Sequence, residues 1–438
     1  MSAEKKRIVK RSKTNSVMEL VASRLGVTPQ ELEREVSGKC KNVLNIAGLD
    51  KAVDLFWSMI DSPVYVYCDY DCDGITSGSI ISIGCNSIGI KPHIIIPRRF
   101  TDGYGIKVKN LENMDPSGLL ITVDNGIAAN EAVNTAKEKG MKVIILDHHE
   151  ARILNGEQFL PEADVVIDPH ITEADFEDYC GAGLAYRFMR EVFAKKRRPA
   201  DLNGIMSSMI ALAAVGTVGD SVTMKAENRF LVRRGMEQIE QKRVSTGLAL
   251  LLEEMKLSDT LSVEDIAYSL VPAINAFGRL EDEGSRKVAA LLSYTGRKSD
   301  GAKNAAQIVK QMNDERKTYC KELTELAEKM VEETGQMNNS VLVLQDDRFL
   351  KGICGIIAGN LTEKYKVPSI VFGAPENGIC VGSGRSRDWC NLKAAMDKCS
   401  GLFFQYGGHP AACGASIQIE NIDTLRQTMC DLIEKVEE

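Results

Sequence analysis

The chain has 438 residues, of which 44% are hydrophobic and 26% are charged, and its net charge is −7. This length predicts two or three domains, and the composition is typical of a soluble globular protein. The charge excludes a protein that is basic over its whole surface, but it is compatible with a local positive groove for phosphate chains.

Targeting and membrane signals are not visible in the sequence. The most apolar stretch, residues 205–219, is shorter than the ~18 residues of a spanning helix and is predicted to be a buried segment. The basic N-terminus is followed by no apolar stretch of a secretory signal. We therefore expect a cytoplasmic protein with no membrane partner, whose twelve cysteines are reduced.

Short apolar runs separated by helical stretches organise the first part of the chain. The runs cover residues 62–68, 118–124, 141–147 and 163–168, and residues 126–140 have the character of a helical connector. Strands that alternate with helices predict a mainly parallel sheet with right-handed crossovers, so the fold class is α/β.

Aspartates stand where these predicted strands end. Asp69, Asp71 and Asp73 follow the first strand, and Asp124, Asp147 and Asp168 follow the next three. Ligands bind at the carboxyl edge of open parallel sheets. The sequence therefore places a candidate site at that edge.

The second part of the chain starts with a predicted long helix over residues 300–335, which lack proline and carry apolar residues at helical spacing. Strand patterns return at 340–345 and 367–373 and are followed by glycine-rich stretches, which predicts a second, smaller α/β domain. The expected domains are an N-terminal extension (1–44), the first α/β domain (45–298), the linking helix (299–337) and the second α/β domain (338–438).

Three aspartates at alternate positions, in "DYDCDG", allow two interpretations. They fit an Asp/Gly turn, and they also fit a site for hard divalent cations. Cys68 and Cys72 raise a zinc site as well, but no second Cys/His pair follows at zinc-site spacing. The stretch alone decides nothing between the first two.

Other motifs favour the cation site. The chain has only five histidines, and two of them, His148 and His149, follow Asp147 at the same predicted sheet edge. Asp220 follows a glycine-rich segment farther on. Carboxylates with one or two histidines suit Mn²⁺ or Mg²⁺, and a pair of cations sharing a carboxylate activates water for phosphoryl chemistry. A dinuclear metal site is therefore the better interpretation.

The motifs "DYDCDGITS", "TVDNG", "DHH" and "GTVGDSV", in this order, resemble those of the DHH phosphoesterase superfamily. "RFTDGYG", "CGAGLAYRF", "LVPAINAFGRLED", "GICGIIAGNLTEKYKVPSIVF" and "GSGRS…YGGHPAACG" narrow the resemblance to RecJ-like single-strand nucleases, from about residue 45 to the C-terminus. It implies a DHH domain and a smaller DHH-associated domain, joined by the long helix, with single-stranded nucleic acid bound in the cleft between them.

The resemblance also implies roles for the acidic and histidine residues. Asp71 and Asp124 would hold one metal ion, with Asp124 as the bridge to a second ion. Asp69 would complete or support the metal shell, Asp147 would orient a histidine, and His149 would contact the scissile phosphate. The second ion would be held by Asp73, Asp124, His148 and Asp220.

By the same resemblance, substrate phosphates are gripped by residues near the basic and glycine-rich motifs. Arginine suits this role because its planar guanidinium binds phosphate oxygens bidentately, and glycines let the backbone approach the strand. The residues so assigned are Arg99, Asn275, Arg279, Ser383, Arg385, Gly407, Gly408 and His409.

The sequence departs from the family pattern at a few places. Tyr67 stands where family members often carry His, and Phe349-Leu350 where they carry Trp-His, so one possible metal contact is weakened. The chain also ends about thirty residues after "GGH", so we expect a compact form without the OB-fold domain of typical bacterial members, with doubtful processivity.

The function implied is a metal-dependent exonuclease that uses two divalent cations, Mn²⁺ or Mg²⁺, and degrades single-stranded DNA from the 5′ end in DNA repair or recombination. Its partners would be single-stranded nucleic acid, with DNA favoured, and other repair or replication proteins. One alternative is a phosphodiesterase for short oligonucleotides or cyclic dinucleotides. Another is a non-catalytic replication scaffold, which the complete set of acids disfavours.

Overall fold

The computed structural model describes residues 16–37, 44–103, 105–154, 156–196, 198–257 and 261–433. The chain divides into two compact units. The first unit comprises Met1–Ile96, Gly105–Val271 and Ala289–Lys298. The second unit comprises Pro97–Tyr104, Pro272–Val288 and Ser299–Glu438, so it includes two segments from earlier in the chain. The domain boundaries derived from the sequence stay a prediction.

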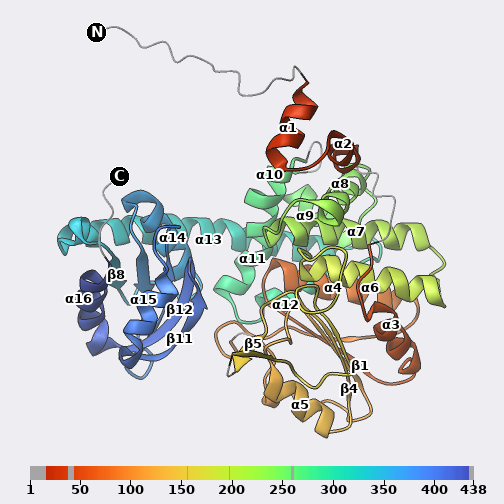
Figure 1. Ribbon diagram of the computed structural model, residues 1–438, viewed down its shortest axis with the longest axis horizontal. Helices are drawn as coiled ribbons and strands as arrows, with labels where there is room; N and C mark the ends of the chain where they lie inside the picture. The colour runs from red at the N-terminus through yellow and green to blue at the C-terminus, as the bar shows by residue number, and fades with distance from the viewer. Residues whose placement is uncertain are drawn as a thin grey trace. The chain divides into compact units, whose positions relative to one another are not determined.

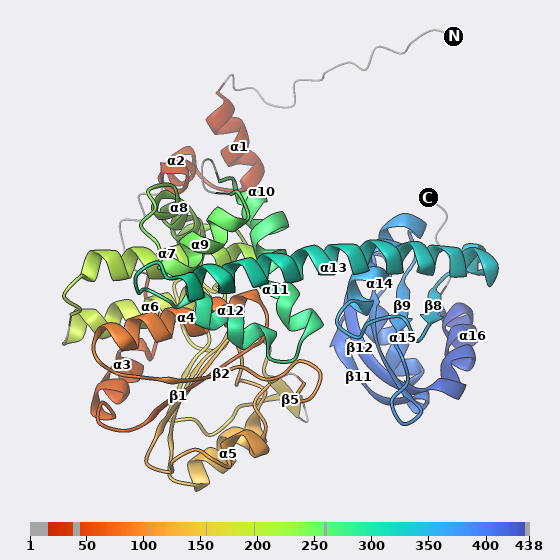
Figure 2. The ribbon, with the colours of Figure 1, turned by 180° about the vertical axis from the view of Figure 1, so that it is seen from behind.

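The first unit is built on a five-stranded parallel sheet (Figures 1 and 2). The strand order is β2-β1-β3-β4-β7, so the chain reverses its direction of travel across the sheet between β1 and β3. Such a switch point opens a crevice at the carboxyl ends of the two strands. The strands are β1 (Val64–Cys68), β2 (His93–Ile95), β3 (Leu119–Val123), β4 (Lys142–Leu146) and β7 (Val165–Ile167).

Helices cover both faces of this sheet, as the alternating pattern predicts. On one face Tyr67, Leu120 and Val143 form an apolar cluster with Val133 of α5 (Asn130–Glu138). The other face contacts α4 (Cys72–Ser87) and α6 (Gly181–Lys195). Gly78 allows the close approach of α4, since a Cβ there would lie 2.4 Å from the sulfur of Cys68. The predicted parallel α/β domain is confirmed.

The most apolar helix, α7 (Leu202–Gly219), is long and apolar enough to cross a membrane by length and composition. However, 61% of it is buried inside the unit, where it contacts α4, α6 and α8 (Ala226–Glu240). Gly235 lets α8 pack tightly, because a Cβ there would lie 2.3 Å from Cβ of Ala214. A core helix explains this apolar run, as predicted for residues 205–219.

The second unit contains the predicted long helix, α13 (Asp300–Glu333), and a mixed five-stranded sheet. The order is β11-β12-β10-β9-β8, in which β8 and β9 are parallel and the other pairs are antiparallel. Core side chains from α13 and α14 (Cys354–Tyr365) cover one part of it. The smaller α/β domain is confirmed. Its strands are β8 (Leu342–Gln345), β9 (Ser369–Phe372), β10 (Ile379–Arg385), β11 (Phe403–His409) and β12 (Ala412–Gln418).

The remaining elements connect or flank these layers. The expected N-terminal extension lies partly outside the described residues, and its described part forms α1 and α2. The elements are α1 (Val17–Leu25), α2 (Pro29–Ser37), α3 (Leu49–Ser58), η1 (Val108–Leu111), β5 (Arg152–Leu154), β6 (Glu157–Phe159), α9 (Thr246–Glu254), α10 (Val263–Asp265), η2 (Ile266–Leu270), α11 (Val271–Leu280), α12 (Gly284–Leu292), η3 (Gln336–Asn338), α15 (Leu392–Lys398), η4 (Ser400–Leu402), η5 (Ile419–Asn421) and α16 (Ile422–Leu432).

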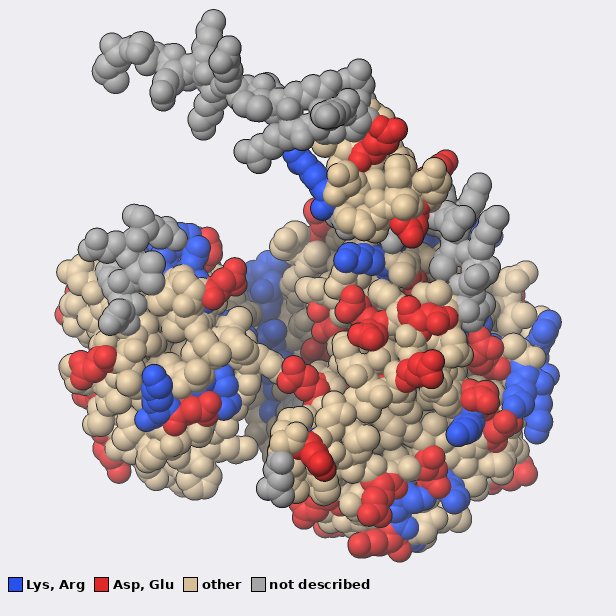
Figure 3. Space-filling model, in the orientation of Figure 1, with Lys and Arg blue, Asp and Glu red and all other residues tan. Residues whose placement is uncertain are grey.

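Charged side chains of both signs are interspersed on the face of the molecule seen in Figure 3. No single-sign field covers that face, in agreement with the exclusion of a protein that is basic all over.

Candidate metal centre and phosphate-binding residues

The carboxyl ends of β1, β3 and β4 bring acidic and histidine residues together at the switch point of the sheet. Asp69 and Asp71 follow β1, Asp124 follows β3, and Asp147 to His149 follow β4. Asp220 reaches the same place from another direction, because it is the C-terminal cap of α7. In the sequence, only a preceding glycine-rich segment marks Asp220.

Asp71 starts helix α4 rather than an isolated Asp/Gly turn. Its Oδ1 accepts hydrogen bonds from the backbone N–H groups of Asp73 (3.0 Å) and Gly74 (3.2 Å), which is the usual role of an N-cap aspartate. Gly74 is required here, because a Cβ would lie 2.4 Å from the carbonyl oxygen of Asp69. The start of α4 therefore accounts for Asp71 and Gly74 of this acidic stretch.

Asp124 occupies a strained turn directly after β3. Its φ of 58° lies in the left-handed region, which Asp and Asn tolerate better than most residues. Gly126 follows with a φ of 118°, and a Cβ there would lie 2.3 Å from Oγ1 of Thr122. The "DNG" turn thereby aims a carboxylate that is only 2% exposed at the centre of the site.

Asp73 is held by the N-terminus of α6, a contact that the sequence motifs do not predict. Its two oxygens accept hydrogen bonds from the backbone N–H groups of Gly181 (2.6 Å) and Ala182 (2.9 Å). Gly181 also abuts Asp124, since a Cβ there would lie 2.6 Å from Cβ of Asp124. The motif "CGAGLAYRF" supplied the signal, because it was part of the resemblance without an assigned role.

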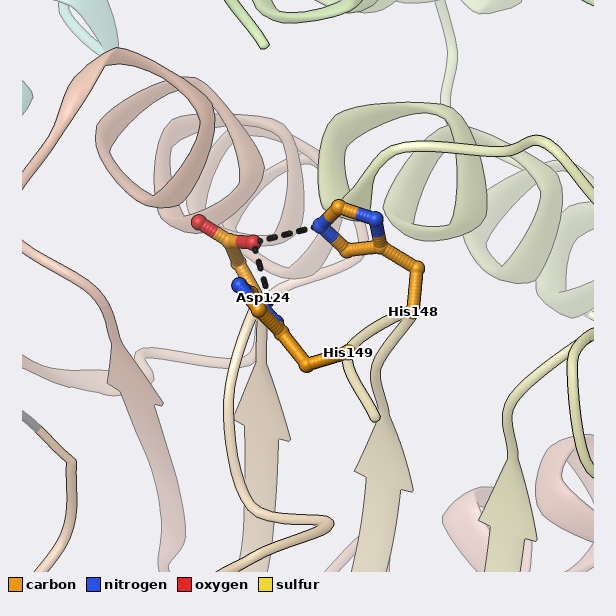
Figure 4. A group of neighbouring side chains, drawn as sticks. All are labelled: Asp124, His148 and His149. Carbon is orange, nitrogen blue, oxygen red and sulfur yellow. Dashed lines mark hydrogen bonds and ion pairs between the residues drawn. The ribbon is translucent and has the colours of Figure 1, made fainter. Parts of the chain in front are cut away.

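The two histidines face Asp124 from the turn after β4 (Figure 4). Nε2 of His148 lies 3.0 Å from Oδ1 of Asp124, and it lies 3.8 Å and 3.7 Å from carboxylate oxygens of Asp73 and Asp220. Nδ1 of His149 lies 2.7 Å from Oδ1 of Asp147 and 4.0 Å from Asp124. His148 therefore faces the carboxylate cluster, and His149 is held by Asp147.

Three groups of these side chains are compact enough to hold a cation, with ligand atoms within 4.8 Å of one another. Two groups share Asp124 and two share His148. Cys68, Cys72 and Asp168 belong to none of them. The groups are Asp69–Asp71–Asp124, Asp73–His148–Asp220 and Asp124–His148–His149.

The electrostatics of the cluster reflect crowded carboxylates. Burial, together with the charges of Asp73, Asp71 and Asp69, raises the pKa of Asp124 well above its usual value. Burial, together with the charges of Asp73 and Asp71, raises the pKa of Asp220 to about 8. These carboxylates carry their charges only at a free-energy cost, which a bound cation would relieve.

The histidines shift in opposite directions. Burial lowers the pKa of His148, which favours the neutral form that binds metal ions. Burial alone would lower the pKa of His149 as well, but the hydrogen bond and charge of Asp147 raise it to about 9. Burial likewise opposes ionisation of Asp147, yet the contact with His149 brings its pKa below the usual value. The contact between Asp147 and His149 thus favours the ionised form of both side chains.

Tyr67, the departure from the family pattern nearest the site, lies in the apolar cluster beneath the sheet. Its hydroxyl donates a hydrogen bond to the carbonyl oxygen of Gly105 (3.1 Å). Phe349 is likewise a core residue of the second unit, at 1% exposure.

All eight residues expected to contact substrate lie in the second unit. Arg385, on β10, is half-buried, and no acidic partner is found for it among the described residues. Burial and the charge of Arg99 lower its pKa. Arg279 donates to the carbonyl oxygen of Gly352 (3.2 Å), and Oδ1 of Asn275, one turn earlier on α11, is buried without a hydrogen-bond partner in the described structure.

A row of small residues crosses the second sheet on the face where α14 packs against β9 and β10. Ser383 on β10 pairs with Gly414 on β12, which pairs with Gly407 on β11. A Cβ at Gly407 or Gly414 would meet nothing within 4 Å, so there is open space beside these two glycines, and we call this strip next to Ser383 the channel. Arg385, Ala412 and His409 form the next row.

Gly408 and Gly407 have different structural roles. The φ of Gly408 is 137°, and a Cβ there would lie 2.3 Å from the carbonyl oxygen of Ala412. Gly408 is therefore explained by the backbone of the β11–β12 hairpin itself, whereas Gly407 leaves open space above the sheet.

Comparison with known proteins identifies the parts of the chain. The description of the DHH family, N-terminal domain, matches residues 63–217, and that of the DHHA1 domain matches residues 338–435. The chain thus contains a DHH domain and a DHHA1 domain. The residues matched to the DHH domain carry the acidic and histidine cluster apart from Asp220, which lies just after them, and the DHHA1 domain carries the channel.

Two named relatives align with most of this chain. It is 31% identical to the single-stranded-DNA-specific exonuclease RecJ of Bacillus subtilis over 88% of this chain and 48% of the relative. It is 29% identical to the RecJ of Escherichia coli over 94% of this chain and 74% of the relative. The chain thus spans about half the length of the first of these relatives.

The fold resembles that of a crystal structure of exonuclease RecJ bound to manganese. The TM-score is 0.75 at 25% identity, and the match covers 90% of this chain and 96% of the other.

Proposed function

We propose that this protein is a metal-dependent hydrolase that cleaves phosphodiester bonds in single-stranded DNA, as a RecJ-like 5′-to-3′ exonuclease. The observation that carries the proposal is the shared position of Asp124 in two compact ligand groups at the switch point of the sheet. RecJ relatives act on single-stranded DNA by name, and a similar RecJ structure holds manganese.

The donor set fits two divalent cations, Mn²⁺ or Mg²⁺. Carboxylates with one imidazole are ligands for such hard or borderline ions, and the raised pKa values of Asp124 and Asp220 indicate charges that lack compensation. Asp71 and Asp124 would hold one ion, with Asp69 in support. The other would be held by Asp73, Asp124, His148 and Asp220. When bound, the pair supplies a lowered water pKa and charge neutralisation at a phosphoryl oxygen.

The chain's own residues orient and stabilise the substrate around this centre. Asp147 holds His149 through the 2.7 Å contact and favours its protonated form, since the hydrogen bond and charge of Asp147 raise the pKa of the imidazole. A protonated imidazole at this place would donate a hydrogen bond to the scissile phosphate as negative charge builds up there. The N–H groups of Gly181 and Ala182 fix Asp73 so that it does not turn away.

The second unit contributes phosphate and sugar contacts. Arg385, held near Arg99 without an acidic partner in the described structure, is a site of uncompensated positive charge and fits a phosphate. Asn275 and Arg279 lie four residues apart on one face of α11. Oδ1 of Asn275 has no hydrogen-bond donor in the described structure and could accept one from the substrate. Ser383 and Gly407 border the open channel, while His409 lies in the row of Arg385.

Location and partners follow from this activity. Single-stranded DNA is the substrate partner, and other repair or replication proteins would deliver it during DNA repair or recombination. We place the protein in the cytoplasm, where such DNA is processed.

Labelled single strands of graded length, incubated with Mn²⁺, test the proposal. We expect mononucleotides to be released from the 5′ end of long strands and no cleavage in EDTA. A protein that cleaves only dinucleotides to pentanucleotides, or cyclic dinucleotides, would instead support the alternative of a small-substrate phosphodiesterase. Absence of any Mn²⁺-dependent cleavage would support a non-catalytic scaffold.

A further inference from the structure

One carboxylate of the second unit fastens the loop that carries Arg99. Oδ1 of Asp282 accepts a hydrogen bond from the backbone N–H of Phe100 (2.8 Å), and its Oδ2 accepts one from the hydroxyl of Thr101. The loop and Asp282 lie more than 180 residues apart in sequence. Both belong to the second unit, although neither is part of its sheet.

The loop over residues 97–103 is closed on itself. Oδ2 of Asp102 accepts hydrogen bonds from the backbone N–H (3.0 Å) and Nε (3.1 Å) of Arg98, and the N–H of Asp102 donates to the carbonyl oxygen of Arg98 (2.8 Å). Arg99 therefore sits in a loop of defined shape. The contacts of Asp282 with Phe100 and Thr101 attach the loop to the segment that follows helix α11.

Asp282 thereby connects segments that carry two of the arginines assigned to the substrate. Arg279 lies three residues before Asp282, in the last turn of α11, and Arg99 immediately precedes Phe100. Arg279 is in turn tied to Gly352. Gly355 follows nearby, where a Cβ would lie 2.9 Å from a guanidinium nitrogen of Arg385. The three arginines thus stand on segments that contact one another.

Asp282 is an unexpected residue beside arginines that should bind phosphate, because its charge would repel that ligand. Its two oxygens are occupied by the donors of the loop, so the carboxylate acts as a fastener for the loop. We propose that Asp282 is a positioning residue that holds Arg99 in register with Arg279 and Arg385, so that the three guanidinium groups bind the phosphates of one strand together. This inference rests on the proposed function.

The test compares Asp282→Ala, Asp282→Asn and Thr101→Val with the control Glu281→Ala. Glu281 lies on the same turn and pairs with Lys287, so its removal makes the same change of charge without releasing the loop. Binding of a 5′-phosphorylated fluorescent single strand is measured by anisotropy in Ca²⁺. Turnover in Mn²⁺ is measured with single-stranded DNA and with bis(p-nitrophenyl) phosphate, which is too small to reach beyond the metal centre.

For Asp282→Ala we expect Kd and KM for DNA to rise about 10-fold or more, as for loss of one charge-assisted contact, with kcat on the small diester unchanged. Asp282→Asn should stay near the parent protein, since its amide oxygen still accepts the N–H of Phe100. Thr101→Val should weaken binding less, and it should add nothing to Asp282→Ala because both remove the same fastening.

Unchanged Kd and KM in Asp282→Ala would overturn the inference. An equal loss with Glu281→Ala would also overturn it, because charge alone would then explain the effect. A fall in turnover of the small diester would indicate a general loss of structure and would count against positioning. A parent protein that binds DNA but does not cleave it would contradict the proposed function while leaving the binding comparison intact.

Discussion

Nε2 of His148 lies 3.0 Å from Oδ1 of Asp124, although the two residues are 24 positions apart and follow different strands. The parallel pairing of β3 with β4 fixes this relationship, because Val123 and Leu146, the last residues of the two strands, are paired. Each side chain is then one or two residues past the sheet edge. At this distance the two side chains can form a hydrogen bond, or they can bind the same cation. The negative charge of the surrounding carboxylates favours the cation.

Replacing Asp124 by Asn should abolish metal-dependent hydrolysis without unfolding the protein. Asn tolerates the left-handed φ of this position, and it removes a buried charge from a crowded cluster. We expect activity to fall by more than about 100-fold, at least as much as for loss of a residue that only supports a ligand. The melting temperature in EDTA should stay equal or rise, while the increase caused by Mn²⁺ should disappear.

Asp300→Asn is the matched control for this change, because Asp300 is fully exposed in the first turn of α13. It should leave activity and the effect of Mn²⁺ unchanged. An Asp124→Asn protein that keeps a tenth of the parent activity would contradict the assignment of Asp124 as a shared ligand.

Gly181→Ala should damage the metal centre through packing alone. The new methyl group would lie 2.6 Å from Cβ of Asp124 and 3.1 Å from an oxygen of Asp73, so one of the two carboxylates must move. Such overpacking typically costs about 1–3 kcal/mol of folding stability. We expect weaker Mn²⁺ binding by calorimetry and a matching loss of activity.

Gly183→Ala, two residues along the same helix, provides the comparison. Its methyl group would make its nearest contact at 3.3 Å, with a ring carbon of Tyr179, which requires only a small adjustment. If both variants bound Mn²⁺ equally well, close contact between α6 and Asp124 would have no bearing on the metal centre.

The strand ends and the long helix could be predicted from sequence because their signals are local. Apolar runs mark β1, β3 and β4, and a parallel sheet necessarily brings their carboxyl ends to one edge, so the proximity of Asp71, Asp124 and His148 follows. The absence of proline and the helical spacing were sufficient to predict α13. These elements needed no knowledge of distant contacts.

Other features of the site had no local signal. Asp73 is held by backbone N–H groups of α6. Every residue type except proline has such a donor, so the sequence does not show which ones bind Asp73. Likewise, the loop that carries Arg99 joins the second unit through Asp282, a contact between residues far apart in the chain. Gly407 and Gly408 look equivalent in sequence, and only backbone geometry separates an open channel from a hairpin requirement.

Metal removal should make folding stability depend on pH through Asp220. The pKa of this group in the folded chain is about 8, above its usual value near 4, so the folded state binds a proton that the unfolded state releases. This contribution is fully present below pH about 4 and is lost as the pH rises through about 8. In EDTA, the parent protein should therefore lose stability relative to Asp220→Asn between pH 5 and pH 8.

Urea unfolding at pH 5, 6.5 and 8, with EDTA or with Mn²⁺, measures this difference. Mn²⁺ favours the ionised carboxylate, so it should remove or reverse the advantage of Asp220→Asn. If the difference in stability between the two proteins did not change with pH in EDTA, the raised pKa of Asp220 would be wrong.

Gly414→Val should block the channel on the second sheet while leaving the metal centre intact. A Cβ at Gly414 meets nothing within 4 Å, and valine is a favourable strand residue, so the fold should be unaffected or slightly stabilised. The added side chain would stand between Ser383 and Gly407 on the same face of the sheet. We expect KM for single-stranded DNA to rise with the size of the side chain, in the order glycine, alanine, valine. Turnover of bis(p-nitrophenyl) phosphate should stay constant.

Gly401→Val is the control, since Gly401 also has open space around it but lies in η4, outside the strands. Equal KM values for Gly414→Val and the parent protein would exclude this channel as a path for the DNA strand.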